Sequence, residues 1–131
     1  MHHALNIGLD PKILGTSGVP QTAFPAIDPR DVEAGLAAAR DELMEVGLNL
    51  DSCFISDLAD VGAPLRRALQ TRRYDVAVIG AGVRLEPALT PVLELLVNVI
   101  RTHSPETSIC FNTGPGSTAA AIRRWWPDGP L

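Results

Sequence analysis

The chain of 131 residues is 46% hydrophobic and 20% charged, and its formal net charge is −4. These values predict one compact domain spanning residues 1–131, because so short a chain cannot build two separate hydrophobic cores. They argue against a nucleic-acid-binding protein, which needs a basic surface to neutralise phosphates.

The segments expected of a secreted or membrane protein are missing from the sequence. Met1 to Ala4 is not a basic leader followed by a long apolar stretch, and no apolar run is long enough to cross a bilayer. Cys53 and Cys110 fall within predicted strands, which is typical of buried thiols in a reducing compartment and not of a disulfide or a metal site. We therefore expect a cytoplasmic protein with no membrane partner, no metal and no cofactor.

The predicted elements alternate between strands and helices from the N-terminus. Residues 4–9 form a short first strand, which Asp10 and Pro11 end. The segment from Pro11 to Pro29 contains several glycines and prolines and has no periodicity, so it predicts a long loop that serves as a lid, a binding loop or a mobile segment.

A helix follows, with Asp28 as its N-cap and Pro29 as its first residue. Its apolar residues recur at helical spacing as far as Val46, and Gly47 is its expected stop. A second strand over residues 50–56 leads to a helix through Val61 and Leu69, with Asp57 and Asp60 as alternative caps.

The most strongly apolar stretch is the run from Val76 to Ile79, which is unbroken and largely β-branched. Such a run suits a central parallel strand that is covered on both faces. It ends at Gly80, where a glycine turn begins.

The helix predicted over residues 90–101 has Thr90 as N-cap and Pro91 as its first helical residue. Apolar side chains cover most of its circumference, whereas a surface helix normally shows one apolar stripe. A second partner must cover it. We predict a homodimer through this helix, and the alternative is that the long loop covers it.

A fourth strand over residues 108–112 precedes a turn over residues 113–118 and a last helix from Ala119 to about Trp126. Four strands alternating with four helices predict a three-layer α/β/α sandwich with a parallel sheet. Right-handed crossovers and a central third strand favour the strand order 2-1-3-4, which is Rossmann-like or flavodoxin-like.

In such a sheet, ligands bind beyond the carboxyl ends of the strands where the chain order reverses, here between the first and third strands. The glycine turns supply backbone N–H groups and Arg84 supplies a positive charge, which together favour a small anion such as phosphate or carboxylate. The predicted ligand-binding residues are Gly80, Ala81, Gly82, Arg84, Asn112, Thr113, Gly114, Gly116, Ser117 and Thr118.

Neither glycine turn matches a nucleotide-binding motif. Leu85 stands where a dinucleotide fingerprint needs its third glycine, and the turn over residues 113–118 lacks the lysine of a Walker loop. A purely structural reading, with glycines for the turn and Ser117 as helix N-cap, explains most of the second turn equally well.

Candidates for catalysis are few. His103 stands at a helix C-terminus, where a cap or an exposed residue is the more frequent role. Asp10 stands at the carboxyl end of the first strand and is the weak candidate for an acid or base, although a turn aspartate explains it as well.

Two groups of residues resemble a pattern found in a group of small uncharacterised α/β proteins. The first is Tyr74-Asp75 with Ile79-Gly80-Ala81-Gly82, Arg84 and Pro87, and the second is residues 109–113 with Pro115, Thr118 and Arg124-Trp125. The resemblance covers about residues 29–126. It implies that Arg84, Asn112 and Thr118 belong to the group's pattern, and it implies no activity, cofactor or catalytic residue.

Three functional hypotheses remain open at this point. The first is the binding of a small anionic ligand at the carboxyl ends of the strands. The alternative is a structural or interaction protein that forms a homo-oligomer and binds no ligand. The third is an enzyme acting on a small phosphorylated or carboxylated metabolite, for which no acid and base pair is evident.

Overall fold

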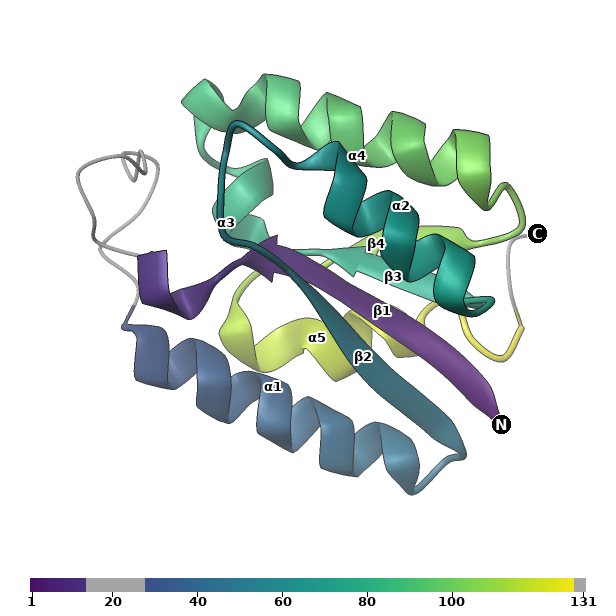
Figure 1. Cartoon of the computed structure of the whole chain (residues 1–131). Helices are drawn as coiled ribbons and strands as arrows, with labels where there is room; N and C mark the ends of the chain where they lie inside the picture. The colour runs from purple at the N-terminus through teal and green to yellow at the C-terminus, as the bar shows by residue number, and fades with distance from the viewer. Residues whose placement is uncertain (14–27, 129–131) are drawn as a thin grey trace.

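A four-stranded parallel sheet forms the centre of the protein (Figure 1). The computed structural model describes residues 1–13 and 28–128. The strands are β1 (His2–Leu9), β2 (Leu48–Ile55), β3 (Val76–Ile79) and β4 (Ser108–Phe111), and their order is β2-β1-β3-β4. The predicted parallel sheet and its strand order are confirmed.

Helices cover both faces of the sheet and complete the predicted sandwich (Figure 1). The helices α1 (Pro29–Met44) and α5 (Thr118–Arg123) lie on one face, and α2 (Gly62–Thr71) and α4 (Thr90–His103) lie on the other. A one-turn helix, α3 (Ala81–Arg84), follows β3 directly and was not predicted.

The strand period of two divides the core between the two faces. Leu5 and Ile7 of β1 belong to the apolar cluster under α2 and α4, whereas Ala4 belongs to the cluster under α1 and α5. All four residues of β3 are at most 1% exposed. The apolar run from Val76 to Ile79 is therefore an interior strand, as its composition predicted.

The boundaries of α1 agree with the sequence signals. The Asp28 carboxylate accepts a hydrogen bond from the Arg30 N–H at 2.9 Å, as an N-cap does, and Pro29 is the first helical residue. Gly47 follows the helix with a φ of 83°, a left-handed conformation that favours glycine.

The predicted caps of α2 and α4 are wrong. Val61 precedes α2 without a side-chain cap, and the Asp57 carboxylate instead accepts the Ala59 N–H within the preceding loop. Thr90 is already helical, because α4 continues directly from a 3-10 turn over residues 87–89. That turn supplies the helical start that a cap would otherwise provide.

The apolar circumference of α4 finds its second partner within the chain. Leu96 and Ile100 are fully buried, and Leu95 and Val99 approach Gly62 at the start of α2. The helix α4 thus packs on the sheet and on α2 together, and among its large apolar side chains Leu95 is 43% exposed.

The structure bears on three further expectations, which concern the long loop, the two cysteines and membrane-spanning helices. Only Pro11–Ile13 and the last two residues of the predicted loop, Asp28 and Pro29, belong to the described residues, so its role as a lid or mobile segment lies outside them. Cys53 and Cys110 are buried free thiols, as expected. No helix among residues 1–13 and 28–128 is long and apolar enough to cross a membrane.

Candidate functional site

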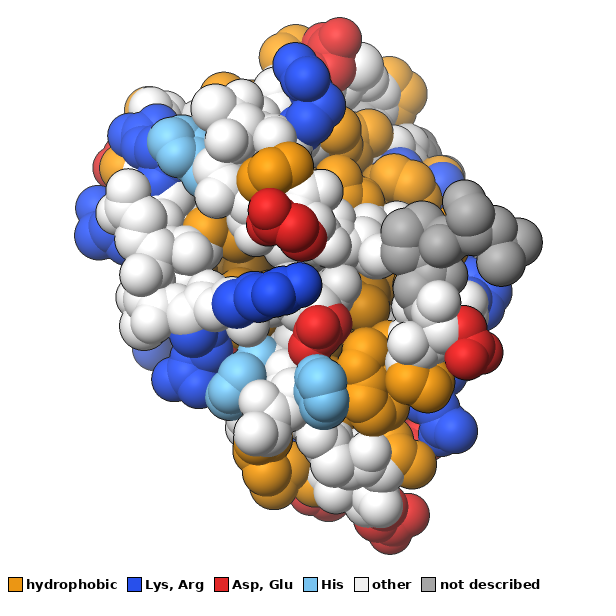
Figure 2. Space-filling view, turned by 90° about the vertical axis from the view of Figure 1, so that its right-hand side faces the viewer, with side chains coloured by type: hydrophobic (Ala, Val, Ile, Leu, Met, Phe, Trp, Pro, Cys, Tyr) orange, Lys and Arg blue, Asp and Glu red, His pale blue; other side chains and the backbone are white. Residues whose placement is uncertain are grey.

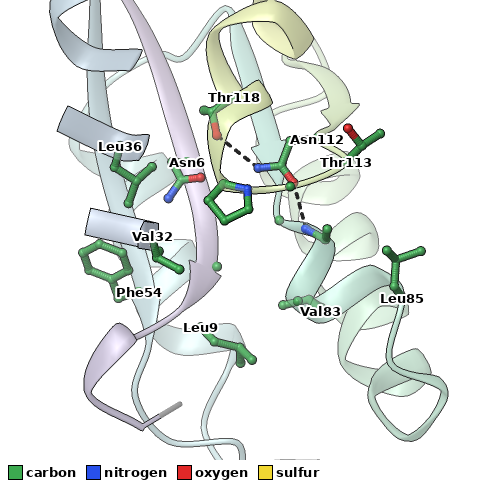
Figure 3. Close-up of a pocket in the computed structure, with 16 residues that line it drawn as sticks. Asn6, Leu9, Val32, Leu36, Phe54, Val83, Leu85, Asn112, Thr113 and Thr118 are labelled. Atoms are coloured by element: carbon green, nitrogen blue, oxygen red, sulfur yellow. Dashed lines mark hydrogen bonds between the residues drawn. The ribbon is translucent and has the colours of Figure 1, made fainter. Parts of the chain in front are cut away.

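A cavity of about 290 Å³ opens where the carboxyl ends of β1 and β3 meet, at the predicted crevice (Figure 3). Residues from β1, α1, β2, the turn after β3 and the turn after β4 line it. Its size lies at the lower end of the range typical of small-molecule pockets.

Most of the residues predicted to bind a ligand line this cavity. The two glycine turns lie on the same rim of the sheet, because parallel strands end at the same edge. The predicted residues in the lining are Gly80, Ala81, Gly82, Asn112, Thr113, Gly114 and Thr118.

Arg84 does not line the cavity. A terminal nitrogen of its guanidinium donates to the Asn112 carbonyl at 3.1 Å, and the guanidinium carbon lies 5.7 Å from the centre of the Phe111 ring. The side chain therefore ties α3 to the end of β4. The positive charge on which the anion prediction depended lies outside the cavity lining, and the Nε of Arg84 is buried without a hydrogen-bond partner.

Gly116 and Ser117 do not line the cavity either. The Ser117 hydroxyl accepts the backbone N–H groups of Thr113 and Gly114, at 2.9 and 3.2 Å, and gives no side-chain cap to α5. Ser117 is the N-cap residue of α5, as predicted, but its side chain bonds the preceding turn and not the first turn of the helix.

A buried hydrogen-bond chain joins the two turns across the cavity. The Asn112 side-chain oxygen accepts the Ala81 N–H at 2.8 Å, and the Asn112 side-chain nitrogen donates to the Thr118 hydroxyl at 3.0 Å (Figure 3). These bonds fix both side chains, and Thr118 is only 1% exposed. The hydroxyl keeps its own proton to donate to a further acceptor.

Asn6 is the polar residue that sequence reasoning missed. It lies in the middle of β1, is 5% exposed and lines the cavity. Figure 3 shows its amide between Leu36 of α1 and the pair Asn112 and Thr118. Within the described residues its side chain forms no hydrogen bond, and its amide atoms are not among the enclosed unpaired ones, which are Ser52 Oγ and Arg84 Nε. The Asn6 amide therefore borders the open space of the cavity.

The rest of the lining is apolar. Val32 and Leu36 of α1 form one wall with Phe54 of β2, and Leu9 and Val83 line it further along (Figure 3). None of these was predicted. None of the described lining residues carries a charge.

A close approach of α1 to the turn after β4 sets this wall in place. A Cβ added to Gly35 would overlap the carbonyl oxygen of Pro115. Gly35 is therefore a glycine by steric necessity, although glycine lowers the stability of a helix interior. The contact positions Leu36, the next residue of α1, at the cavity.

The glycines of the two turns are not required by the backbone conformation or by close contacts. None of Gly80, Gly82, Gly114 and Gly116 has a left-handed backbone, and a Cβ at any of them would meet nothing closer than 3.6 Å. The backbone conformation does not require them. In the lining, the lack of side chains leaves space in the cavity.

The titratable groups near the strand ends have structural roles. The Asp10 carboxylate accepts the Lys12 N–H and the Ser56 hydroxyl, each at 2.9 Å, and does not line the cavity. Burial raises the pKa of the Cys53 thiol, and it raises that of Cys110 to about 12. Both thiols stay protonated at neutral pH and are poor nucleophiles.

The opposite end of the molecule, where the strands begin, carries a second hollow. Figure 2 faces this end and shows histidine, acidic and basic side chains interspersed, without a patch of one sign. His2 lies there, 3.0 Å from the Asp75 carboxylate and 63% exposed in its side chain. No group of three or more His, Cys, Asp or Glu side chains that could hold a metal occurs within the described ranges.

Fold and cavity together define the class of the protein. It is a parallel α/β protein with a flavodoxin-like strand order and an uncharged crevice at the carboxyl ends of its central strands. Comparisons with protein-family models and with curated proteins find no match.

Proposed function

We propose that the protein binds a small organic molecule in the cavity between β1 and β3. The observation that carries the proposal is the Asn6 amide, which is buried in the lining and has no hydrogen-bond partner in the described chain. The Asn6 amide borders the open space of the cavity, so a molecule that enters it can form the hydrogen bonds that the described chain does not supply.

The composition of the lining supports a ligand that is mostly apolar. Val32, Leu36 and Phe54 offer apolar surface, whereas Asn6, Asn112 and Thr118 offer neutral polar groups. This combination of apolar walls and a few fixed polar groups is typical of small-molecule sites.

Filling the cavity tests the proposal. Gly8 lines it, and a Cβ at Gly8 would meet nothing within 4 Å, so Gly8→Val adds bulk to the cavity and its Cβ has room. We expect wild-type protein to bind members of a library of small aromatic compounds by ligand-observed NMR, and Gly8→Val to lose this binding. Ala38→Val places the same side chain on the exposed side of α1 and should keep this binding. Equal binding by Gly8→Val and wild type contradicts the proposal.

A small anion, the ligand predicted from the sequence, stays a prediction with less support. The lining residues that the structure describes have no charge to offset the desolvation of an anion, and Arg84 is bonded to the Asn112 carbonyl. The resemblance to a group of small α/β proteins also stays a proposal, and of its pattern Asn112 and Thr118 line the cavity.

The homodimer through residues 90–101 and the enzyme hypothesis stay predictions as well. The exposed Leu95 is the residue of α4 through which a second copy is most readily tested. The enzyme hypothesis has little support, because Asp10 is bonded to the chain around it and does not line the cavity.

A further inference from the structure

We infer that the ligand is uncharged and presents a hydrogen-bond donor next to an acceptor, as a carboxamide or a lactam edge does. The inference rests on the proposed binding function and names the chemistry that the site selects. It starts from the two ends of the Asn6 amide.

An asparagine amide has an oxygen that accepts and a nitrogen that donates. In Asn6 both ends lack a partner in the described chain, and the residue is 95% buried, since only 5% of its surface is exposed. A group with a donor beside an acceptor satisfies both ends at once through two parallel hydrogen bonds. A carboxylate has only acceptors at neutral pH, so it leaves the Asn6 oxygen without a donor.

The neighbouring polar groups add a donor to this site. Asn112 uses its oxygen on the Ala81 N–H and directs its nitrogen to the Thr118 hydroxyl, so the hydroxyl proton is left to donate. A carbonyl oxygen can accept from Asn6 and from Thr118 together, because it has two lone pairs. The site thus favours a carbonyl with an adjacent N–H over a hydroxyl or an amine alone.

The backbone holds this array rigidly. Asn6 is paired in register with Ser52 of β2 on one side and with Val78 of β3 on the other, so its Cα is fixed within the interior of the sheet. A fixed amide discriminates between ligands because it cannot turn away from a mismatched group.

The apolar walls of the cavity indicate the shape and polarity of the remainder of the ligand. Phe54 is 37% exposed and faces the cavity beside Val32, which suits a flat apolar ring. We infer an aromatic or unsaturated ring that carries the amide edge and fits a cavity of about 290 Å³.

Three probes of nearly equal shape separate the possibilities. Benzamide has a donor and an acceptor, acetophenone has the acceptor alone, and benzoate has two acceptors and a charge. Titrations followed by protein NMR should give wild-type protein an affinity for benzamide about tenfold or more above its affinity for the other two. Asn6→Leu should lower the benzamide affinity by a similar factor and leave acetophenone nearly unchanged.

Further variants and a stability measurement complete the test. Gly8→Val should lose all three probes, and Asn6→Leu without ligand should melt at or above the wild-type temperature, because the substitution breaks no hydrogen bond within the described chain. Equal affinity for the three probes, or tighter binding of benzoate, overturns the inference and leaves the binding function intact. If no probe binds, or if Gly8→Val keeps them all, the binding function fails too. A clear loss of melting temperature in Asn6→Leu shows that the amide serves the fold.

Discussion

At the scale of single residues, Gly35 shows how a locally unfavourable choice can serve a tertiary contact. Glycine in a helix interior lowers stability by about 0.5 to 1 kcal/mol relative to alanine. Gly35 nevertheless stands inside α1, where it lets the helix meet the backbone of Pro115. The wall formed by α1 reaches the cavity because of this contact.

We predict that Gly35→Ala destabilises the protein, by about 1 to 3 kcal/mol in the free energy of unfolding measured with urea, because overlap with backbone cannot be relieved by a rotamer change. Gly116→Ala is the control. A Cβ there meets nothing within 4 Å, and the backbone is not left-handed, so alanine should raise stability by about 0.4 to 1 kcal/mol. A stabilised Gly35→Ala variant would show that α1 does not contact the turn after β4.

We predict that titration of Cys110 lowers the free energy of unfolding as the pH rises above about 9. Burial raises the pKa of its thiol from 9.0 to about 12, against a smaller opposite effect of Arg124. Below pH 9 the thiol is protonated in both the folded and the unfolded chain, and its contribution to stability is intact. Between pH 9 and about 12 only the unfolded chain releases the proton, so the free energy of unfolding falls by up to about 1.4 kcal/mol per pH unit.

Urea unfolding at several pH values between 9 and 11 measures this slope. Cys110→Ala should reduce the slope by up to about 1.4 kcal/mol per pH unit, which is the contribution of one titrating group. A smaller slope should remain, because burial and the hydrogen bond to Asp51 also raise the pKa of Tyr74. An unchanged slope in Cys110→Ala would mean that the thiol titrates normally in the folded protein.

At the scale of elements, α4 shows why a nearly continuous apolar surface does not by itself identify an oligomer. Periodicity showed that the helix needs two partners, and the sheet and α2 are those partners. The neighbouring residues Leu95 and Leu96 differ in exposure. Leu95 is 43% exposed, on the partly solvent-facing side of α4, and Leu96 is fully buried in the core.

We predict different results for two substitutions in α4. Leu96→Ala should cost about 2 to 5 kcal/mol in the free energy of unfolding, as truncation of a buried leucine does. Leu95→Glu should cost less, about 1 kcal/mol, because Leu95 is 43% exposed although it also contacts the start of α2. Light scattering of Leu95→Glu tests the homodimer at the same time. Loss of a wild-type dimer supports an interface through α4, and a dimer that persists excludes it.

At the scale of the whole molecule, the sequence predicts the fold because its signals are local and agree with one another. The run from Val76 to Ile79 indicates an interior strand, and Asp28-Pro29 indicates a helix start. Strands that alternate with helices through short loops indicate a parallel sheet. The carboxyl-end crevice then follows from the topology. The predicted turns after β3 and β4 do meet there, as their order in the sheet requires.

The details of the cavity depend on tertiary contacts that no local pattern shows. Asn6 is one polar residue within a short strand, and its sequence gives no sign that its amide lacks a partner. Val32 and Leu36 look like ordinary core positions of an amphipathic helix until Gly35 brings α1 to Pro115. Arg84 follows the turn after β3, which does line the cavity. Its position in the sequence does not predict that its guanidinium donates a hydrogen bond to the Asn112 carbonyl.

The sheet as a whole leads to a prediction about hydrogen exchange. The strand β3 pairs with β1 and β4, and its residues are at most 1% exposed, so its amides should exchange only when the whole molecule unfolds. The edge strand β4 pairs with β3 alone in the described chain. The Ser108 N–H donates to the Asp75 carbonyl on the β3 side, and alternation along the strand directs the Cys110 N–H to the same side.

The same alternation points the N–H groups of Ile109 and Phe111 to the open edge of the sheet. We therefore expect exchange measured by NMR at neutral pH to be slow at Cys110, with the free energy of unfolding as its limit, and orders of magnitude faster at Ile109 and Phe111. Slow exchange at all three residues would contradict an open edge. Such a result would show that the edge of β4 is covered.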